Sequence, residues 1–475
     1  MIAQSAGLGE ELNMQAHPSK VYLSELIGAL SYALDLTEGL PPGHCLRSCW
    51  IGMQIAIEIQ MDDTARSDVF FTILLKDAGC SSNAARIYEL YDNDDLSVKA
   101  DFYAVDHQSL TQVANFVWSH LAPQAPIREK LSRLMHLAIK GDELQDEVVT
   151  ARCERGASIA KRMGFNDRIA EGINSLNEHW NGKGRPNHLS GNNIPIQSRI
   201  ALLAQVVEIF YSAGGPACAL SEACRRSGTW FDPRLVAALN LAAGKPSFWA
   251  SLRSGDLERT VMNLEPASHA IEVDDEHIDI IAEAFAEVID SKSPFTSGHS
   301  SRVAEFVDAI AEELGLSDVR RRTLRRIALL HDIGKLGVSN AILDKPGKLT
   351  DDEWACIKRH PVYSRNILER ISIFAAFASV AGGHHERLDG KGYPDGIGES
   401  HIPLETRIIT TADIFDALTA DRPYRKAMPL QQAMTIMEKD RDVAIDADCL
   451  DALKRFLAKT GGTAVCTSAL QPLTA

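Results

Sequence analysis

The stretch "TSGHSSRVAEFVDAIAEELGL", residues 296–316, decides the fold class because its apolar residues recur every three or four positions. This spacing is typical of an amphipathic helix that packs one face against a core. Six residues form the apolar stripe: Val303, Phe306, Val307, Ile310, Ala311 and Leu314. Helical periodicity dominates the rest of the chain, and no alternating run of strand length is comparably clear. We therefore predict an all-α protein.

The same stretch has a counterpart near the beginning of the chain. "PPGHCLRSCWIGMQIA" (41–56) aligns with "TSGHSSRVAEFVDAIA" (296–311) at an offset of 255 residues, and "LLKDAGC" (74–80) aligns with "LLHDIGK" (329–335) at that same offset. Further along, "LNEHWNGKGRP" (176–186) aligns with "HHERLDGKGYP" (384–394) at an offset of 208. A duplication explains both series. The change of offset predicts a 47-residue insertion in the first copy, within residues 90–147.

We expect two homologous helical bundle domains arranged in tandem. The expected divisions are an N-terminal segment at 1–19, the first copy at 20–242, a connector at 243–275, the second copy at 276–466 and a tail at 467–475. The connector is rich in Pro, Gly and acidic residues. A chain of 475 residues, 45% of them hydrophobic, is long enough to form more than one core.

Composition narrows the cellular setting and the classes of partner. A net charge of -15 argues against broad binding to nucleic acid polymers or anionic membranes. We expect no apolar run to reach the roughly 18 residues of a spanning helix, and the N-terminus does not resemble a signal peptide. The nine cysteines include no Cys-x-x-Cys pair, so we expect reduced, buried thiols in a cytoplasmic protein.

The second copy concentrates residues that bind metals. They are His299, the pair His331 and Asp332, His360, the pair His384 and His385, and Asp413. Asp413 interrupts an apolar helical stretch, where an unpaired acid would cost several kcal/mol. Imidazole and carboxylate ligands without thiolates suit Fe, Mn or Zn. Seven groups exceed the needs of one ion, so we expect two metals, with Asp332 as the candidate bridge.

Helix start and stop signals in the sequence predict where these residues lie on their helices. Thr350 and Glu353 in "KLTDDEWACIKRHP" form a capping box that starts a helix, and Pro361 is expected to end it, which places His360 on its last turn. Gly334 in "HDIGK" is expected to break the helix that carries His331 and Asp332.

Taken together, "SGHS", "LLHDIGK", "KRHP", "HHERLDGKGYPDG", "IPLETRI" and "ADIFDALTADRPYR" resemble the HD-GYP domain, a subgroup of the HD phosphohydrolases. The resemblance runs over about residues 290–430 and implies hydrolysis of the messenger cyclic di-GMP. It implies one metal on His331, Asp332 and Asp413, and a second on Asp332, His360, His384 and His385. His299 matches an upstream family histidine that ligates metal or supports substrate. Phe295 stands where some members place a glutamate for a third metal, which favours two.

The resemblance also assigns the cofactors and the substrate contacts. The metals would be Fe or Mn, with Zn, Ni and Mg as alternatives. Water activated by these cations would attack phosphorus in line. Asp332 and Lys335 are the expected catalytic residues, and Lys335, Tyr393, Arg422 and Arg425 the expected substrate contacts. The alternatives are a helix-end cation for Lys335, surface ion pairs for the arginines and core packing for Tyr424.

In the segment "HHERLDGKGYPDG" (384–396), His384 and His385 are expected ligands, and the glycines Gly390, Gly392 and Gly396 permit tight turns. We expect this loop to fold back over the metals as a substrate wall; an ordinary surface turn is the alternative. The resemblance further implies a diguanylate cyclase domain as a partner, and a homodimer is a further expectation.

The first copy lacks most of these ligands. At the aligned positions, Lys76 replaces His331, Arg152 replaces His360, Leu176 and Asn177 replace the histidine pair, Gln205 replaces Asp413, and only His44 and Asp77 are retained. We expect this copy to be free of metal and inert. Two interpretations remain open: a retained scaffold, or an anion pocket built from Lys76, Arg152 and Arg185.

The leading functional hypothesis is a metal-dependent phosphodiesterase that hydrolyses cyclic dinucleotides, with cyclic di-GMP as the first candidate substrate. A second hypothesis keeps the chemistry and changes the substrate to cyclic GMP-AMP or a nucleotide monoester. A third is a receptor that binds a cyclic dinucleotide without hydrolysing it. The intact ligand set argues against the receptor, because unused buried carboxylates destabilise a fold.

Overall fold

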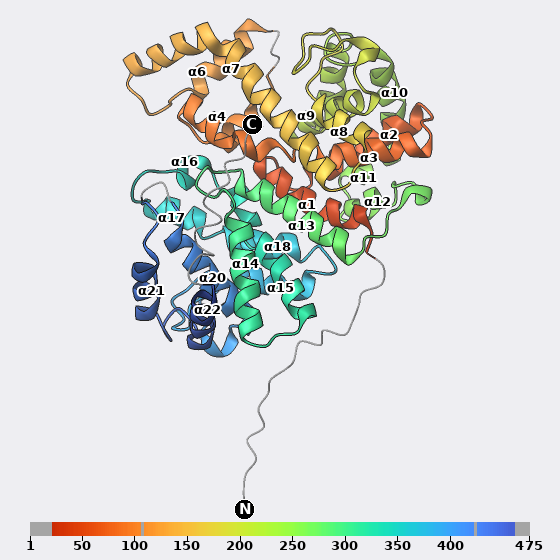
Figure 1. The fold of residues 1–475 in the computed structure, drawn as a ribbon. Coiled ribbons are helices and arrows are strands. Elements are labelled where there is room, and N and C mark those ends of the chain that lie inside the picture. The colour runs from red at the N-terminus through yellow and green to blue at the C-terminus, as the bar shows by residue number, and fades with distance from the viewer. Residues whose placement is uncertain (1–20, 106–108, 422–424, 461–475) are drawn as a thin grey trace, which may run out of the picture.

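The computed structural model describes residues 21–105, 109–421 and 425–460, and within them the regular elements are helices, joined by turns and isolated β-bridges (Figure 1). The predicted all-α fold is confirmed. The expected N-terminal segment and C-terminal tail lie outside the described residues, as do Arg422 and Tyr424.

The first half of the chain contributes ten α-helices to the described residues. They are α1 (Leu23–Thr37), α2 (His44–Glu58), α3 (Asp63–Leu75), α4 (Ala84–Tyr91), α5 (Asp95–Phe102), α6 (Leu110–His120), α7 (Ile127–Arg162), α8 (Asp167–Asn174), α9 (Ile196–Arg225) and α10 (Pro233–Ala243), with 3₁₀ turns η1 (Cys80–Asn83) and η2 (Gly191–Asn193). Helices α11 (Pro246–Leu252) and α12 (Leu257–Met262) and turn η3 (Ala267–His269) follow in the expected connector.

The second half contains ten further α-helices among the described residues. Its elements are α13 (Asp275–Asp290), α14 (His299–Glu313), α15 (Asp318–Leu330), η4 (Ile333–Gly337), α16 (Asn340–Leu343), α17 (Asp351–Ile357), α18 (His360–Leu368), η5 (Ala375–Phe377), α19 (Ala378–Gly382), η6 (Glu399–His401), α20 (Leu404–Thr419), α21 (Leu430–Lys439) and α22 (Ala447–Lys459). In α14, Val303, Phe306, Val307, Ile310 and Ala311 are buried, as its apolar stripe predicts.

The helices recur at the predicted offsets. Helices α2 and α14 begin 255 residues apart and both contain 15 residues, and α9 and α20 begin 208 residues apart. The additional residues of the first copy form α5, α6 and the first half of α7. Helix α6 and the start of α7 lie at the edge of the molecule in Figure 1, whereas α5 contacts the second copy. Together with α4 they enclose a small apolar cluster: Ile87, Val98, Val105 and Phe116. On these matched elements we propose the two-domain division expected from the sequence.

A second difference in length separates the copies, and the sequence alignment missed it. In the first copy, α9 continues through a bend at Gly215 (φ 76°, ψ -171°), and its last part starts at Pro216. In the second copy, α20 ends at Thr419 and α21 begins at Leu430. Helices α10 and α22 then begin 214 residues apart, so the second copy has six more residues between α20 and α21.

Helix α9 is long and apolar enough to cross a membrane by length and composition, in contrast to the expectation of no such segment. Half of its most apolar window is buried inside the protein, and it packs against α2, α3, α8 and α10. These contacts are those of a central helix in the first copy. The cytoplasmic location stays a prediction.

The two copies exchange contacts through their first helices, which lie between the two halves in Figure 1. Helix α1 contacts η4 and α18 of the second copy, and α13 contacts η1 and α7 of the first. The segments before these helices pair through backbone hydrogen bonds from Leu23 to Ile271 (2.8 Å) and from Val273 to Val21 (3.0 Å). The short turn that follows Asp332 is therefore supported by the first copy.

Asp95 of α5 joins the two copies in a buried polar contact. Its Oδ1 accepts hydrogen bonds from Ser339 Oγ (3.0 Å) and from the backbone N–H of Asn340 (2.7 Å). Its Oδ2 lies 3.6 Å from Lys292 Nζ, and both side chains are buried. Burial lowers the pKa of Lys292 to about 8, although Asp95 raises it.

We expect Asp95→Ala to lower the free energy of unfolding by about 3 kcal/mol, because it leaves Lys292 without its buried partner. Chemical denaturation would measure this loss. Asp101→Ala in the same helix is the control: the side chain is 65% exposed, and its removal should cost at most about 0.5 kcal/mol. Equal losses in the two variants would show that Asp95 does not anchor the copies.

Candidate metal centre

Most of the predicted ligands lie at the ends of helices. His299 begins α14, His331 and Asp332 follow α15, and His360 begins α18. The pair His384 and His385 follows α19 after one residue, Gly383, whereas Asp413 lies within α20. Helix ends allow adjacent residues to face one centre, which the interior of a helix does not.

The predicted position of His360 was wrong. The capping box of Thr350 and Glu353 is present and starts α17, but this helix already ends at Ile357. A new helix, α18, begins at His360, with Pro361 in its first turn. Proline lacks only an N–H that the first turn does not use, so it starts this helix rather than ending the previous one.

Gly334 has a different role from the predicted helix breaker. Helix α15 ends at Leu330, before the glycine is reached. A Cβ at Gly334 would lie 2.0 Å from the carbonyl oxygen of His360, so only glycine permits this approach of η4 to α18. Gly79 of the first copy meets the carbonyl of Arg152 in the same way. The glycine brings His331, Asp332 and His360 together.

Asp332 lies at the centre of the cluster. Its Oδ2 is 3.3 Å from His299 Nε2 and 3.4 Å from His331 Nε2. Its Oδ1 is 3.2 Å from His360 Nε2 and 3.6 Å from His384 Nε2. Each carboxylate oxygen therefore faces a different pair of imidazoles, an arrangement that suits a bridge between two cations.

The imidazoles turn their free nitrogen toward this centre. In His331, His360 and His384, Nδ1 lies 2.6, 2.7 and 2.5 Å from the carbonyl oxygen of the residue three positions earlier. A carbonyl only accepts, so Nδ1 carries the proton and Nε2 presents a lone pair. His331 Nε2 and Asp332 Oδ1 are buried without a hydrogen-bond partner. These residues fit divalent cations.

Two further groups complete the cluster. His385 groups with His360 and His384, and Asp413 groups with His331 and His384; within each group the ligand atoms lie within 4.8 Å of one another. His299 Nε2 also lies 3.4 Å from Asp413 Oδ1. The structure thus brings all seven predicted ligands into one site.

The charges of Asp332 and of three of the histidines match the forms that bind metals. Burial lowers the pKa of His331 to about 4, and burial also lowers the pKa values of His360 and His385. The carboxyl pKa of Asp332 is held well below its usual range by Lys335 and His331, although burial opposes this shift. Neutral imidazoles and an ionised carboxylate result.

His299 differs from the other histidines because an acid supports its second nitrogen. Its Nδ1 lies 2.7 Å from Asp416 Oδ2, and Arg302 donates to the same carboxylate at 2.5 and 3.0 Å. Burial would lower the pKa of His299, but hydrogen bonds to Asp332 and Asp416 raise it to about 9.

The sequence interpretation missed Asp416 and Arg302. The sequence did contain a signal for Asp416: it lies three residues after the predicted ligand Asp413, and therefore on the same face of α20. The first copy keeps this support, since Glu208 contacts both His44 and Arg47.

Of the predicted substrate contacts, Lys335 and Tyr393 lie at the cluster, whereas Arg425 contacts the end of a helix. Lys335 Nζ contacts Asp332 Oδ2, and the Tyr393 ring centre lies 4.8 Å from that of His385. Arg425 instead donates to the backbone carbonyls of Ala417 and Leu418 at the end of α20, at 2.5 and 2.9 Å. In this structure Arg425 caps a helix, and its contact with substrate stays a prediction.

The glycine loop is held by a buried acid that the sequence interpretation also missed. Glu386 accepts hydrogen bonds from the backbone N–H groups of Asp395 (2.6 Å) and Ile397 (3.1 Å). Gly390 and Gly396 adopt left-handed backbone angles, as a tight turn requires. Glu178 holds the loop of the first copy in the same way, and the aligned glutamates were the available signal.

At the corresponding site of the first copy, basic side chains have internal partners. Lys76 Nζ pairs with Asp77, and both side chains are fully buried. Arg152 donates to the Tyr103 hydroxyl (3.1 Å), and Arg185 Nε lies 2.6 Å from Asp146 Oδ1. These pairs favour the scaffold interpretation over an anion pocket.

A group of Glu38, Asp77 and Cys80 also lies near this position. Lys76 pairs with Asp77, Lys99 lies 3.5 Å from Glu38, and burial raises the pKa of the Cys80 thiol well above its usual value. A protonated thiol and ammonium groups do not fit a metal.

We expect Lys76→Met to leave the metal content of the protein unchanged while lowering the free energy of unfolding by roughly 3–5 kcal/mol, because Asp77 loses its buried partner. Metal analysis and chemical denaturation would measure the two quantities. Lys183→Met, at an exposed position of the same copy, is the control. A loss of bound metal in Lys76→Met would reveal a metal site in the first copy.

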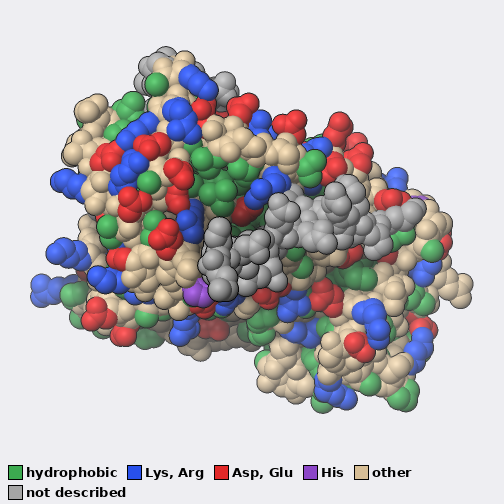
Figure 2. Space-filling model, turned by 90° about the horizontal axis from the view of Figure 1, so that it is seen from below, with side chains coloured by type: hydrophobic (Ala, Val, Ile, Leu, Met, Phe, Trp, Pro, Cys, Tyr) green, Lys and Arg blue, Asp and Glu red, His purple; other side chains and the backbone are tan. Residues whose placement is uncertain are grey.

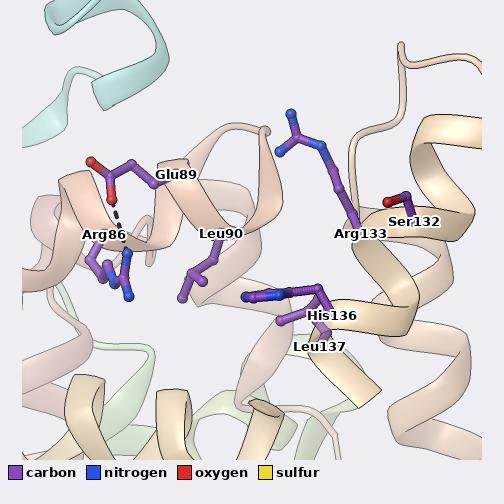
Figure 3. A pocket seen from close by; sticks show the side chains of 7 residues that line it. All are labelled: Arg86, Glu89, Leu90, Ser132, Arg133, His136 and Leu137. Atoms are coloured by element: carbon purple, nitrogen blue, oxygen red, sulfur yellow. Dashed lines mark hydrogen bonds and ion pairs between the residues drawn. The ribbon is translucent and has the colours of Figure 1, made fainter. Parts of the chain in front are cut away.

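A pocket of about 380 Å³ lies away from the cluster, between α4 and α7 (Figure 3). Its lining residues are Arg86, Glu89, Leu90, Ser132, Arg133, His136 and Leu137. Arg86 pairs with Glu89 and Glu147, and Arg133 pairs with Asp92 and Glu129. Its cations are thus neutralised internally.

The distribution of surface charge and the burial of the cysteines can be compared with what the composition predicts. On the face drawn in Figure 2, Lys and Arg side chains lie among Asp and Glu side chains rather than in one broad basic patch. Eight cysteines lie in the described residues and all are free. Five are buried, but Cys224 and Cys356 are exposed, so the expectation of buried thiols was wrong for these two.

The chain is similar to known HD-domain proteins and to cyclic dinucleotide phosphodiesterases. The HD domain family matches residues 124–235 and 283–449. The chain is 49% identical over 435 residues to "3'3'-cGAMP-specific phosphodiesterase 3" of Vibrio cholerae, which covers 92% of this chain and 94% of that protein. A cyclic di-GMP phosphodiesterase response regulator of Xanthomonas campestris is 40% identical over 37% of this chain and 47% of its own length.

A solved structure is similar over most of the chain. The crystal structure of a cyclic GMP-AMP specific phosphodiesterase from V. cholerae superposes with a TM-score of 0.66 and 44% sequence identity. The match covers 93% of this chain and 98% of that one.

Proposed function

Because this chain belongs to the HD-GYP family of HD-domain phosphodiesterases, we propose that its second copy hydrolyses 3′,3′-cyclic GMP-AMP with two divalent metal ions. The general activity, phosphodiester hydrolysis of a cyclic dinucleotide, follows from the family and its relatives. The number of metals, their identity and the choice of substrate are our inference.

One observation carries the proposal: four imidazoles lie around the two oxygens of a single buried carboxylate, Asp332. We assign one metal to His331, Asp332 and Asp413 and the other to Asp332, His360, His384 and His385. When bound, the cations lower the pKa of water and neutralise charge on the phosphate. Nitrogen and oxygen ligands without thiolates support Fe or Mn.

The remaining residues of the site act on the substrate or on the ligands. Lys335 lies beside Asp332 with 20% of its side chain exposed, so its ammonium can reach a phosphate oxygen at the surface of the cluster. Asp416 holds His299 toward Asp332 through its Nδ1. The loop after His385 places Tyr393 beside that ligand.

We propose cyclic GMP-AMP rather than cyclic di-GMP as the substrate. This reverses the order of the two candidate substrates that was expected from the sequence. The relative that matches 92% of the chain is named for cyclic GMP-AMP. The cyclic di-GMP relatives of X. campestris and Thermotoga maritima match 37% and 30% of the chain. The similarity that includes the first copy therefore supports cyclic GMP-AMP.

The test compares kcat/KM for the two cyclic dinucleotides, with protein purified anaerobically and supplied with Fe(II) or Mn(II). We expect linear dinucleotide or mononucleotide as product and a preference for cyclic GMP-AMP of about tenfold or more, a difference of about 1.4 kcal/mol. A preference for cyclic di-GMP would overturn the substrate assignment. If both substrates stay intact while metal is bound, the protein is a receptor or acts on another phosphoester.

A further inference from the structure

An aromatic series leads from the metal cluster to the protein surface. The ring of His385, a proposed ligand, lies 4.8 Å from the ring of Tyr393 with an interplanar angle of 31°. Tyr393 in turn lies 6.0 Å from Trp354 of α17. Lys358 Nζ lies 5.5 Å from the centre of the Tyr393 ring and 5.6 Å from that of Trp354.

Trp354 and Lys358 are exposed, Tyr393 is half-buried, and the helix that carries the indole is firmly held. The Trp354 side chain is 42% exposed, and Lys358 is exposed beside it. Helix α17 is fixed at its start by the Thr350 and Glu353 capping box, and Lys345 also binds Glu353 at 2.7 Å. The indole therefore offers a rigid apolar face and a neighbouring positive charge next to the metal cluster.

The first copy shows that the fold does not need aromatic residues at these places. At the offset of 208, Trp354 corresponds to Asp146 and Tyr393 to Arg185. These two side chains also contact each other, as an ion pair of 2.6 Å. The contact between helix and loop is thus kept in both copies, but it is aromatic only in the copy that has the metal ligands. Its chemistry therefore serves a ligand of the second copy.

We propose that Trp354, Tyr393 and Lys358 form a binding site for one purine base of the cyclic dinucleotide. The base stacks on the Trp354 indole, and the Tyr393 ring, at 73° to that indole, borders it. The Lys358 ammonium contacts a base-edge oxygen or the second phosphate of the ring. Stacking is available to every base and adds no ligand to the metals. The site deepens the proposed function and rests on it, since it needs a nucleotide at the cluster.

The test is the kinetics of Trp354→Ala with cyclic GMP-AMP. Loss of one stacking partner is expected to raise KM by roughly 5–150-fold, with kcat and metal content unchanged. Trp354→Phe should stay close to the wild type because it keeps an aromatic face. The matched control is Trp118→Ala, which removes an indole of similar exposure (47%) from the first copy and should leave KM unchanged.

A second variant tests the site without creating a cavity where the indole was. The double change Trp354→Asp and Tyr393→Arg reproduces the ion pair of the first copy, so the fold and the metal content should be retained while KM rises. An unchanged KM in Trp354→Ala would overturn the base site, and so would an equal loss of metal and kcat. A wild-type protein that leaves cyclic dinucleotides intact would instead overturn the proposed function itself.

Discussion

Asp332→Ala is expected to remove both metal ions and to reduce hydrolysis of cyclic GMP-AMP by at least roughly three orders of magnitude. The reason is the position of the carboxylate, whose two oxygens each lie within 3.6 Å of two imidazole nitrogens. Removing the Asp332 carboxylate deprives both proposed metals of their shared ligand. Metal analysis of the purified variant and chromatography of the products would measure both effects.

The matched control is Asp77→Ala, the same change at the aligned position of the first copy. Asp77 is buried against Lys76, so this variant should lose stability but keep both metals and its turnover per folded molecule. Full metal occupancy in Asp332→Ala would contradict the shared-ligand assignment. A loss of metal in Asp77→Ala would contradict the inert first copy.

Lys335→Met is expected to lower kcat by about 10²–10³-fold while the protein keeps its metals. The ammonium contacts Asp332 and is partly exposed, so it can stabilise charge that develops on the phosphate. Its removal also frees Asp332 Oδ2 from a competing cation, so metal affinity should stay equal or increase. Steady-state kinetics with metal analysis on the same sample would measure both quantities.

Lys391→Met, an exposed lysine in the glycine loop, is the control for loss of one positive charge near the site. It should change kcat by less than about threefold. An unchanged kcat in Lys335→Met would show that Lys335 only neutralises Asp332. A loss of metal would show that it supports the ligands instead.

The fold could be predicted because its evidence is local and repeated. The apolar stripe of α14 specifies a core-facing helix, and its alignment with α2 reveals the duplication. The second length difference escaped detection because Gly215 and Pro216 let α9 continue where the second copy has a separate segment. A bend inside a helix leaves no gap in the helical pattern, so its position cannot be found from periodicity alone.

The clustering of the candidate ligands could be predicted because histidines and buried acids are rare in apolar helices, and their motifs are specific in combination. Residues that act through a ligand could not, because Asp416, Arg302 and Glu386 are ordinary charged residues until the fold brings them together. The contact of Trp354 with Tyr393 joins residues 39 positions apart, on a helix and a loop. Such pairs depend on tertiary packing, which sequence spacing does not encode.

The most direct test of the account is a titration of metal-free protein with Mn(II), following bound metal and hydrolysis of cyclic GMP-AMP in the same sample. We predict that activity is absent without metal and reaches its maximum when two ions are bound per chain, with no further tight binding. Full activity with one ion bound, or four ions bound per chain, would contradict a two-metal centre confined to the second copy.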